Sequence, residues 1–133
     1  MKKSVLVATV SALVLTACAS NMRVVRTPDP HYPNVTIAGG KYIVVNQEPI
    51  VIPNNEKDTW ITWQLPVDST YSFPADGIVI ANAGDEFKCN LEADKKRFAC
   101  KDKNSKSGKY KYTIKVIDGS KPLEPLDPFI MND

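Results

Sequence analysis

Three cysteines and a single histidine carry the most distinctive side-chain chemistry in this chain of 133 residues. Cys89 and Cys100 lie symmetrically about the 94/95 midpoint. A hairpin with a two-residue or four-residue turn there brings their Cα atoms to about 4.5–5.5 Å, which suits a disulfide. There is no Cys-x-x-Cys motif, so we expect a structural bridge. His31 follows Pro30 and is predicted to be a solvated linker residue; one histidine cannot complete a zinc site, a copper site or a Ser-His-Asp set.

Three acidic residues are the candidates for acid–base catalysis. Asp76, Asp85 and Glu86 lie near the ends of predicted strands, where they could converge. Paired carboxylates hydrolyse glycosidic bonds when a cleft holds them and one pKa is raised, and the sequence shows neither condition. No phosphate-binding glycine loop or nucleotide fingerprint occurs. The sequence therefore predicts a non-enzymatic protein without catalytic residues, metal or cofactor, and a small carboxylate-dependent hydrolase is the competing class.

The segments that would position these residues are short runs of β-branched and aromatic residues separated by turn residues. No segment has convincing helical periodicity. The runs cover residues 35–38, 41–45, 49–52, 59–65, 77–81, 86–92, 97–101 and 109–117. The sequence therefore predicts an all-β fold, a single antiparallel β-sandwich of about seven strands.

Basic residues gather in the second half of the chain, where the stretch 88–115 carries ten Lys or Arg against three acids. In the predicted hairpin and in the strand 109–117, charged side chains alternate with apolar ones. If these strands share a sheet, one face carries a candidate binding surface made of Lys88, Arg97, Lys101, Lys109, Lys111 and Lys115. Such a face suits anionic headgroups, lipopolysaccharide phosphates or an acidic protein patch. The alternative is a solvated face whose lysines protect sheet edges against aggregation.

The N-terminus carries a targeting pattern. Lys2 and Lys3 precede an apolar run over residues 5–15 that is too short to span a bilayer, and the run leads into Leu-Thr-Ala-Cys at positions 15–18. This pattern resembles the signal peptide and lipobox of a bacterial lipoprotein. The resemblance implies that residues 1–17 are removed and that Cys18 becomes a lipidated first residue, anchored by acyl chains. Ala19 after the cysteine favours the outer membrane.

Cleavage would leave 116 residues, which is the length of one domain. Residues 18–34 form the lipidated cysteine and a proline-rich tether in this interpretation, and residues 35–133 form the sandwich. In the alternative, Val24, Val25 and Tyr32 pack as an extra edge strand.

The mature chain carries 15 Lys or Arg and 15 Asp or Glu, so its charge gives no argument for nucleic acid. Export through an oxidising compartment supports the predicted disulfide.

Two positions resemble immunoglobulin-like sandwiches. The Gly-x-Tyr segment that ends at Tyr110 resembles their tyrosine corner. Trp63, which alternates with Ile61 and Leu65, resembles their buried central tryptophan. The two cysteines are too close in sequence for the inter-sheet disulfide of antibody domains, and Tyr112 stands in place of the second cysteine. A cupredoxin-like sandwich gives a similar pattern, but its copper ligands cannot be assembled from one histidine.

Two further segments carry aromatic or apolar residues beside prolines. One is 66–76, with Tyr71 and Phe73, and the other is 125–133, with Phe129, Ile130 and Met131. Exposed aromatics on such loops suit partner recognition, whereas packing against the ends of the sandwich is the expected role.

These observations together predict a lipid-anchored protein of the cell envelope, placed in the outer membrane. Its partners would be the membrane, through the lipid, and an envelope protein or anionic envelope component. It would act as a non-enzymatic binding or structural module through the basic face. The alternatives are an envelope hydrolase and a surface-exposed inhibitor or antigen that presents residues 66–76.

Overall fold

The computed structural model describes residues 26–133; the predicted lipobox, with Cys18, lies outside this range. The described chain contains strands and no helix, so the all-β prediction is confirmed. No helix in this range is long and apolar enough to cross a membrane. The strands of residues 26–133 are β1 (Val35–Ala38), β2 (Tyr42–Val45), β3 (Ile50–Ile52), β4 (Thr59–Gln64), β5 (Tyr71–Ser72), β6 (Ile78–Ile80), β7 (Phe87–Leu91), β8 (Arg97–Asp102), β9 (Gly108–Ile114), β10 (Ile117–Asp118), β11 (Lys121–Pro122) and β12 (Phe129–Asn132).

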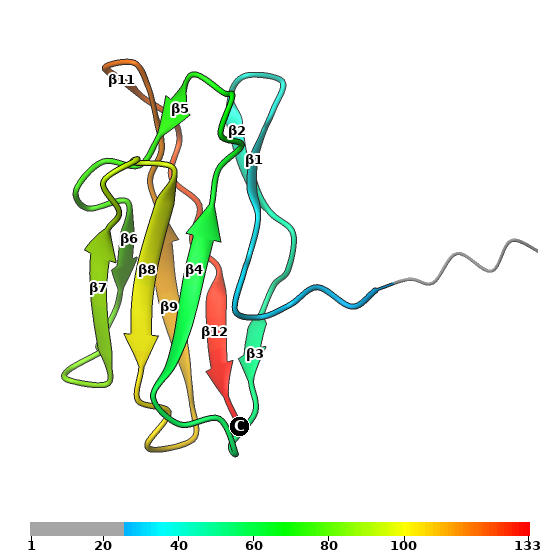
Figure 1. The fold of residues 1–133 in the computed structure, drawn as a ribbon, viewed down its shortest axis with the longest axis vertical. Coiled ribbons are helices and arrows are strands. Elements are labelled where there is room, and N and C mark those ends of the chain that lie inside the picture. Colours follow the sequence, from blue (N-terminus) through cyan, green and yellow to red (C-terminus); the bar gives the residue numbers. More distant parts are fainter. Residues whose placement is uncertain (1–25) are drawn as a thin grey trace, which may run out of the picture.

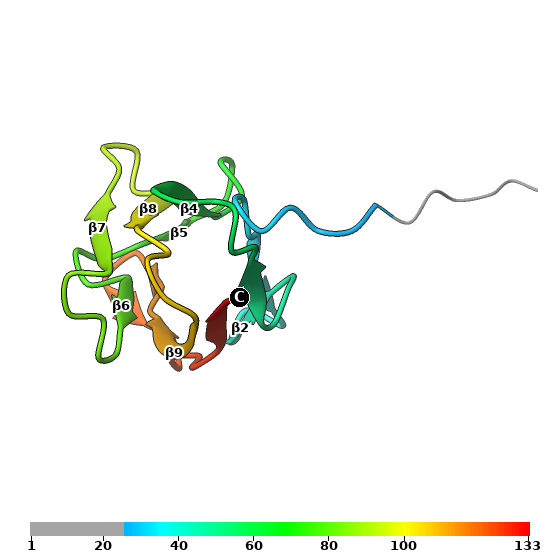
Figure 2. The ribbon, with the colours of Figure 1, turned by 90° about the horizontal axis from the view of Figure 1, so that it is seen from below.

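Two main sheets face each other across the core (Figures 1 and 2). One has the order β4-β8-β7 and the other the order β3-β12-β9-β6. Among the paired strands of residues 26–133, only β3 and β12 run parallel, so the expectation of purely antiparallel pairing is wrong at this edge. Two small sheets, β1-β2 and β11-β10-β5, raise the strand number above the predicted seven.

The core lies where alternating side chains of the two main sheets meet. Trp63 on β4 and Tyr112 on β9 are fully buried, with ring centroids 5.2 Å apart. The Trp63 indole N–H donates a hydrogen bond of 3.3 Å to the Tyr112 hydroxyl, which satisfies both polar groups. Phe73 and Phe98 pack edge to face beside them. The predicted burial of Trp63 is therefore confirmed.

The hairpin of β7 and β8 has the predicted register and the predicted disulfide. Cys89 pairs directly with Cys100, and the two cysteines are bonded, with Cα atoms 4.0 Å apart. The Glu92 N–H donates to the Arg97 carbonyl at 3.0 Å and closes a four-residue turn. Cys100 is buried, whereas Cys89 is exposed, because β7 is the edge strand of its sheet.

The segment before β1 is attached to the body, although the sequence assigned it to a tether. The carbonyl of His31 accepts a 2.8 Å hydrogen bond from Thr62, and the carbonyl of Pro33 accepts a 3.0 Å bond from Gln64. Proline lacks an N–H but keeps its carbonyl acceptor, so this proline-rich segment still pairs with the edge of β4. Hydrogen bonds to the body therefore begin before residue 35, where the sequence placed the start of the sandwich.

Candidate functional site: an apolar groove beside an ion pair

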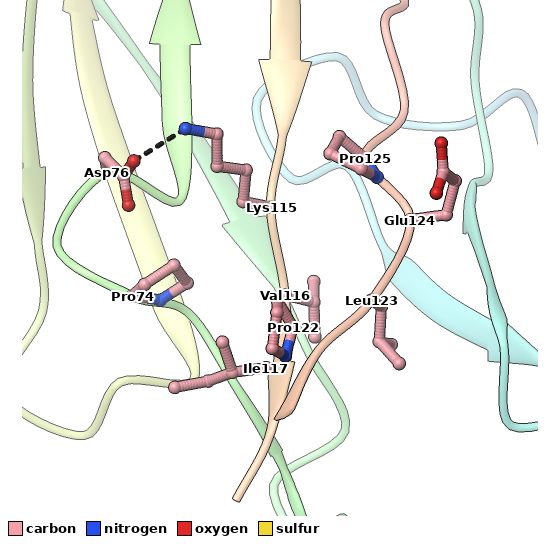
Figure 3. Close-up of a pocket in the computed structure, with 9 residues that line it drawn as sticks. All are labelled: Pro74, Asp76, Lys115, Val116, Ile117, Pro122, Leu123, Glu124 and Pro125. Carbon is pink, nitrogen blue, oxygen red and sulfur yellow. Dashed lines mark hydrogen bonds and ion pairs between the residues drawn. The ribbon is translucent and has the colours of Figure 1, made fainter. Parts of the chain in front are cut away.

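The described surface has a groove of about 560 Å³. It lies between the turn that leads into β6, the chain from the end of β9 into β10, and the segment that follows β11 (Figure 3). The groove is lined by Pro74, Asp76, Lys115, Val116, Ile117, Pro122, Leu123, Glu124 and Pro125. Three of these are prolines and three are aliphatic, so the walls are mainly apolar.

Backbone hydrogen bonds hold both walls to the segment that follows β9. Lys115 N–H donates to the Gly77 carbonyl at 2.8 Å, and Leu123 N–H donates to the Val116 carbonyl at 3.0 Å. A Cβ atom at Gly77 would lie 2.9 Å from the Cβ of buried Phe73, so only glycine fits this turn without a shift of the core. The groove is therefore a built part of the fold.

The polar residues of the groove are Glu124 and one ion pair, in which Lys115 reaches across to Asp76 (Figure 3). The Lys115 Nζ lies 2.6 Å from the Asp76 Oδ2. This hydrogen bond from Lys115 holds the pKa of Asp76 below its ordinary value. Asp76 therefore stays ionised and is unsuited to donate a proton. No Ser, Thr, Tyr, Cys or His lines the groove, and an apolar hollow with few polar groups is suited to binding.

The three acids that the sequence grouped as catalytic candidates do not converge. Asp85 pairs with Lys103 at 2.7 Å, and the hydrogen bond from Lys103 lowers the pKa of Asp85. Glu86 is buried and accepts hydrogen bonds from the backbone N–H of Ser105 at 2.6 Å and from its hydroxyl at 2.7 Å. Asp85 and Glu86 line a separate small hollow that does not include Asp76. The three acids therefore do not line one pocket, and the pKa values of Asp76 and Asp85 are lowered, whereas a general acid needs a raised pKa.

The predicted basic face is divided between two sheets, because the chain crosses from one sheet to the other between β8 and β9. Lys88, Arg97 and Lys101 belong to β7 and β8, whereas the other three candidates belong to β9 or follow it. On the β9 side, Lys109 lies over the Phe129 ring, 4.0 Å from its centroid, Lys111 pairs with Asp127 at 3.3 Å and Lys115 pairs with Asp76. The condition for one basic face, that these strands share a sheet, is therefore not met.

His31 is held between two carboxylates, which corrects the prediction of a solvated linker residue. Its Nδ1 lies 2.9 Å from Asp29 Oδ1 and its Nε2 lies 2.6 Å from Glu56 Oε2. Burial lowers the pKa of His31, but the hydrogen bonds to the two carboxylates outweigh it and raise the pKa overall. A protonated imidazole donates to both, so His31 attaches the N-terminal segment to the body instead of acting as a base.

Each of the two segments with aromatic residues, 66–76 and 125–133, places a side chain in the core. Phe73 is fully buried and Tyr71 is half-buried. Ile130 is fully buried in β12, which lies between β3 and β9. The expected packing role is confirmed for Phe73 and Ile130.

No protein-family model matches the chain, and a search of curated proteins finds no match. Within residues 26–133 no group of three or more His, Cys, Asp or Glu side chains is placed to hold a metal ion. The functional argument therefore depends on the geometry of the described surface.

Proposed function

We propose that this protein is a lipid-anchored, non-enzymatic binding module of the cell envelope, and that the groove beside Asp76 and Lys115 binds an extended apolar segment of an envelope protein. The observation that carries the proposal is the composition of the groove. Its walls are mainly proline and aliphatic side chains, Asp76 and Lys115 neutralise each other, Glu124 adds one carboxylate, and no Ser, Thr, Tyr, Cys or His lines it. Its volume of about 560 Å³ lies within the usual range for ligand sites.

The finer fold that we propose is one immunoglobulin-like sandwich of seven strands. The three strands of β4-β8-β7 correspond in order to B, E and D of that fold, and β6, β9 and β12 correspond to C, F and G. The parallel strand β3 extends the second sheet beyond β12. In this assignment Trp63 lies on B and Tyr112 on F, so their contact joins the two strands that the inter-sheet disulfide joins in antibody domains. The resemblance of Trp63 to the central tryptophan does not hold in this assignment, because that tryptophan lies on strand C.

The anchor is proposed to be Cys18, in the outer membrane. The docked segment begins at Asp29, which leaves ten residues, 19–28, between it and Cys18. Ten residues can span at most about 35 Å. The proposed anchor therefore keeps the domain close to the membrane surface. Labelling with radioactive palmitate tests this: the wild-type protein should be labelled and fractionate with membranes, and Cys18→Ser should abolish both. Unchanged labelling would contradict lipidation at this residue.

Site-specific photo-crosslinking in intact cells tests the groove. The photoreactive amino acid p-benzoylphenylalanine replaces Leu123 inside the groove or, as a matched control, Val79, which is 47% exposed on β6. Illumination should give a discrete protein adduct from position 123 alone. Ile117→Asp, which places a charge in the apolar wall, should remove this adduct while the protein remains folded. No adduct from position 123, or the same adduct from both positions, would contradict the proposal.

A further inference from the structure

The segment before β1 adds side chains to the outer face of the sheet β4-β8-β7. Asn34 pairs in parallel with Gln64 at the edge of β4. Tyr32 and Trp60 lie an even number of residues before this pair. Because side chains alternate between the two faces of a strand, both rings lie on the outer face with Gln64. Tyr32 is 55% exposed and Trp60 is 49% exposed, so this face presents two neighbouring aromatic rings to solvent.

The faces of these two rings are not covered by a cation. Elsewhere the ammonium group of a neighbouring lysine lies 5.0 Å from the ring centroid of Tyr42 and 4.0 Å from that of Phe129. Within residues 26–133 no such contact is made to Trp60 or Tyr32. Because a cation over a ring occupies its face, Trp60 and Tyr32 are the more available of these aromatic side chains.

The charges beside the aromatic pair are balanced. Lys101 lies opposite Trp60 in the strand register. The small hollow that includes this lysine is lined by three acids and three lysines, namely Asp58, Asp85, Glu86, Lys88, Lys101 and Lys103. Recognition at this face therefore depends on the rings and not on the sign of a charge. An indole or a phenol combines an apolar body with a polar N–H or O–H group, which suits the boundary between water and lipid.

The aromatic pair lies close to the point where the N-terminal segment reaches the body. Tyr32 follows Asp29, at which the docked segment begins, by three residues. The residues 19–28 that connect this point to Cys18 can span at most about 35 Å. A lipid surface that holds Cys18 is therefore within reach of this face. A stable protein complex buries about 800 Å² per partner, far more than two rings offer, so a protein partner is disfavoured.

We propose that Tyr32 and Trp60 dock the domain onto the lipid bilayer that carries its anchor, with both rings at the level of the headgroups. This inference rests on the anchor at Cys18 proposed above. β4 begins and β12 ends at one end of the molecule, and β11 lies at the other (Figure 1). Trp60 is near the start of β4, whereas the groove lies beside β11. Contact through Trp60 leaves the groove at the far end, where a partner protein can reach it.

Brominated lipids test the docked face, because bromine in an acyl chain quenches the fluorescence of a nearby indole. The lipidated protein is bound to phosphatidylcholine vesicles with bromine placed either close to the headgroup or close to the chain end. Bromine close to the headgroup should remove more than half of the Trp60 emission, and bromine at the chain end should remove less. Trp60→Phe leaves only the buried Trp63, whose emission should not change. Added salt should not reduce the quenching, since the contact is uncharged.

A second reporter distinguishes this face from the rest of the surface. Trp60→Phe combined with Val79→Trp moves the exposed tryptophan to β6 of the other main sheet, where Val79 is 47% exposed. This reporter should not be quenched. Tyr32→Ser should reduce the quenching of Trp60 at least twofold, while the protein still floats with the vesicles.

The outcomes separate the docked face from the anchor. A protein that floats with the vesicles without quenching of Trp60, or with equal quenching at position 79, would overturn the docked face and leave the anchor intact. A protein that does not float with the vesicles and takes up no palmitate would overturn the anchor, and the docked face with it.

Discussion

The two ends of the space between the main sheets have opposite chemistry. The end where β4 finishes is apolar, and Trp63, Leu65, Phe73 and Phe98 fill it. The end near the C-terminus contains buried polar side chains, namely Glu86, Asp102, Asn104 and Asn132. The apolar end gains stability from burial alone, whereas the polar end must satisfy each buried group by hydrogen bonding.

The polar end satisfies its groups only in part. Asp102 Oδ1 accepts hydrogen bonds from the Asn104 N–H at 2.8 Å and from the Asn132 side-chain amide at 3.1 Å. Three buried side-chain oxygens of the described residues have no partner, and all lie here: Asp102 Oδ2, Asn104 Oδ1 and Asn132 Oδ1. The contrast teaches that burial at the apolar end stabilises the fold, whereas the polar end joins β8 to β12 through the Asp102–Asn132 hydrogen bond and leaves three buried oxygens without a partner, at an energetic cost.

Removal of residues 125–133 should have the largest effect, because it deletes β12, which contributes to both ends. Ile130 fills the core and Asn132 bonds Asp102, while the strand joins β3 to β9. We expect loss of the cooperative unfolding transition, measured by circular dichroism in denaturant. A truncated protein with an unchanged transition would show that β12 is dispensable and would contradict its contribution to both ends of the interior.

Trp63→Ala should cost about 3–5 kcal/mol of unfolding free energy, since it removes the largest fully buried side chain. Trp60→Ala on the same strand is the matched control. Its side chain is 49% exposed, so we expect a change below about 1 kcal/mol. Equal losses for the two variants in urea unfolding would contradict the assignment of the apolar end as the main source of stability.

Replacement of both Cys89 and Cys100 by alanine should cost about 3 kcal/mol or less, because the bridge closes a short loop within one hairpin. The register is also fixed by strand pairing with β4, so the folded structure should persist. Urea unfolding compared with that of the oxidised protein measures the loss. Complete unfolding of the double variant would show that the hairpin depends on the bridge.

Asp102→Asn should instead stabilise the protein at neutral pH, by about 1 kcal/mol, because it removes a buried charge and keeps an acceptor for the Asn132 amide. Burial raises the pKa of Asp102 above its ordinary value of 3.8. The folded state therefore holds a proton that the unfolded state releases, and stability falls as pH rises from 3.8 through the folded pKa. Unfolding measured across this window should show that fall in the wild type and a flatter profile in the variant. A variant that is less stable at every pH would show that the carboxylate itself is required.

The features that the sequence predicted correctly are those that depend on residues close together in the chain. Alternation and cysteine symmetry are local patterns, and they predicted the register of the β7–β8 hairpin. The alternation of side chains does not encode where the chain crosses between sheets after β8. The sequence therefore could not predict which sheet β9 joins, and the six basic residues do not lie on one sheet. The groove is assembled from three separate segments. The contact between His31 and Glu56 joins residues that lie 25 positions apart in the chain. Of the two partners of the His31 ring, only Asp29 is close to it in sequence.

The smallest effect is expected at His31, which provides a second pH window that is distinct from that of Asp102. The pKa of His31 is raised above its ordinary value of 6.5 by the carboxylates that flank it. Its contribution is therefore complete below pH 6.5 and is lost as pH rises through the folded pKa. His31→Gln should reduce stability by up to about 1 kcal/mol at pH 6, because these partly exposed pairs are screened by solvent, and the difference should shrink at higher pH. Thermal unfolding of both proteins from pH 5 to 9 measures this, with Glu56→Gln as the matched variant that removes one partner. A pH-independent difference would mean that His31 acts by packing, and the attachment of the N-terminal segment would then depend on the backbone bonds to β4.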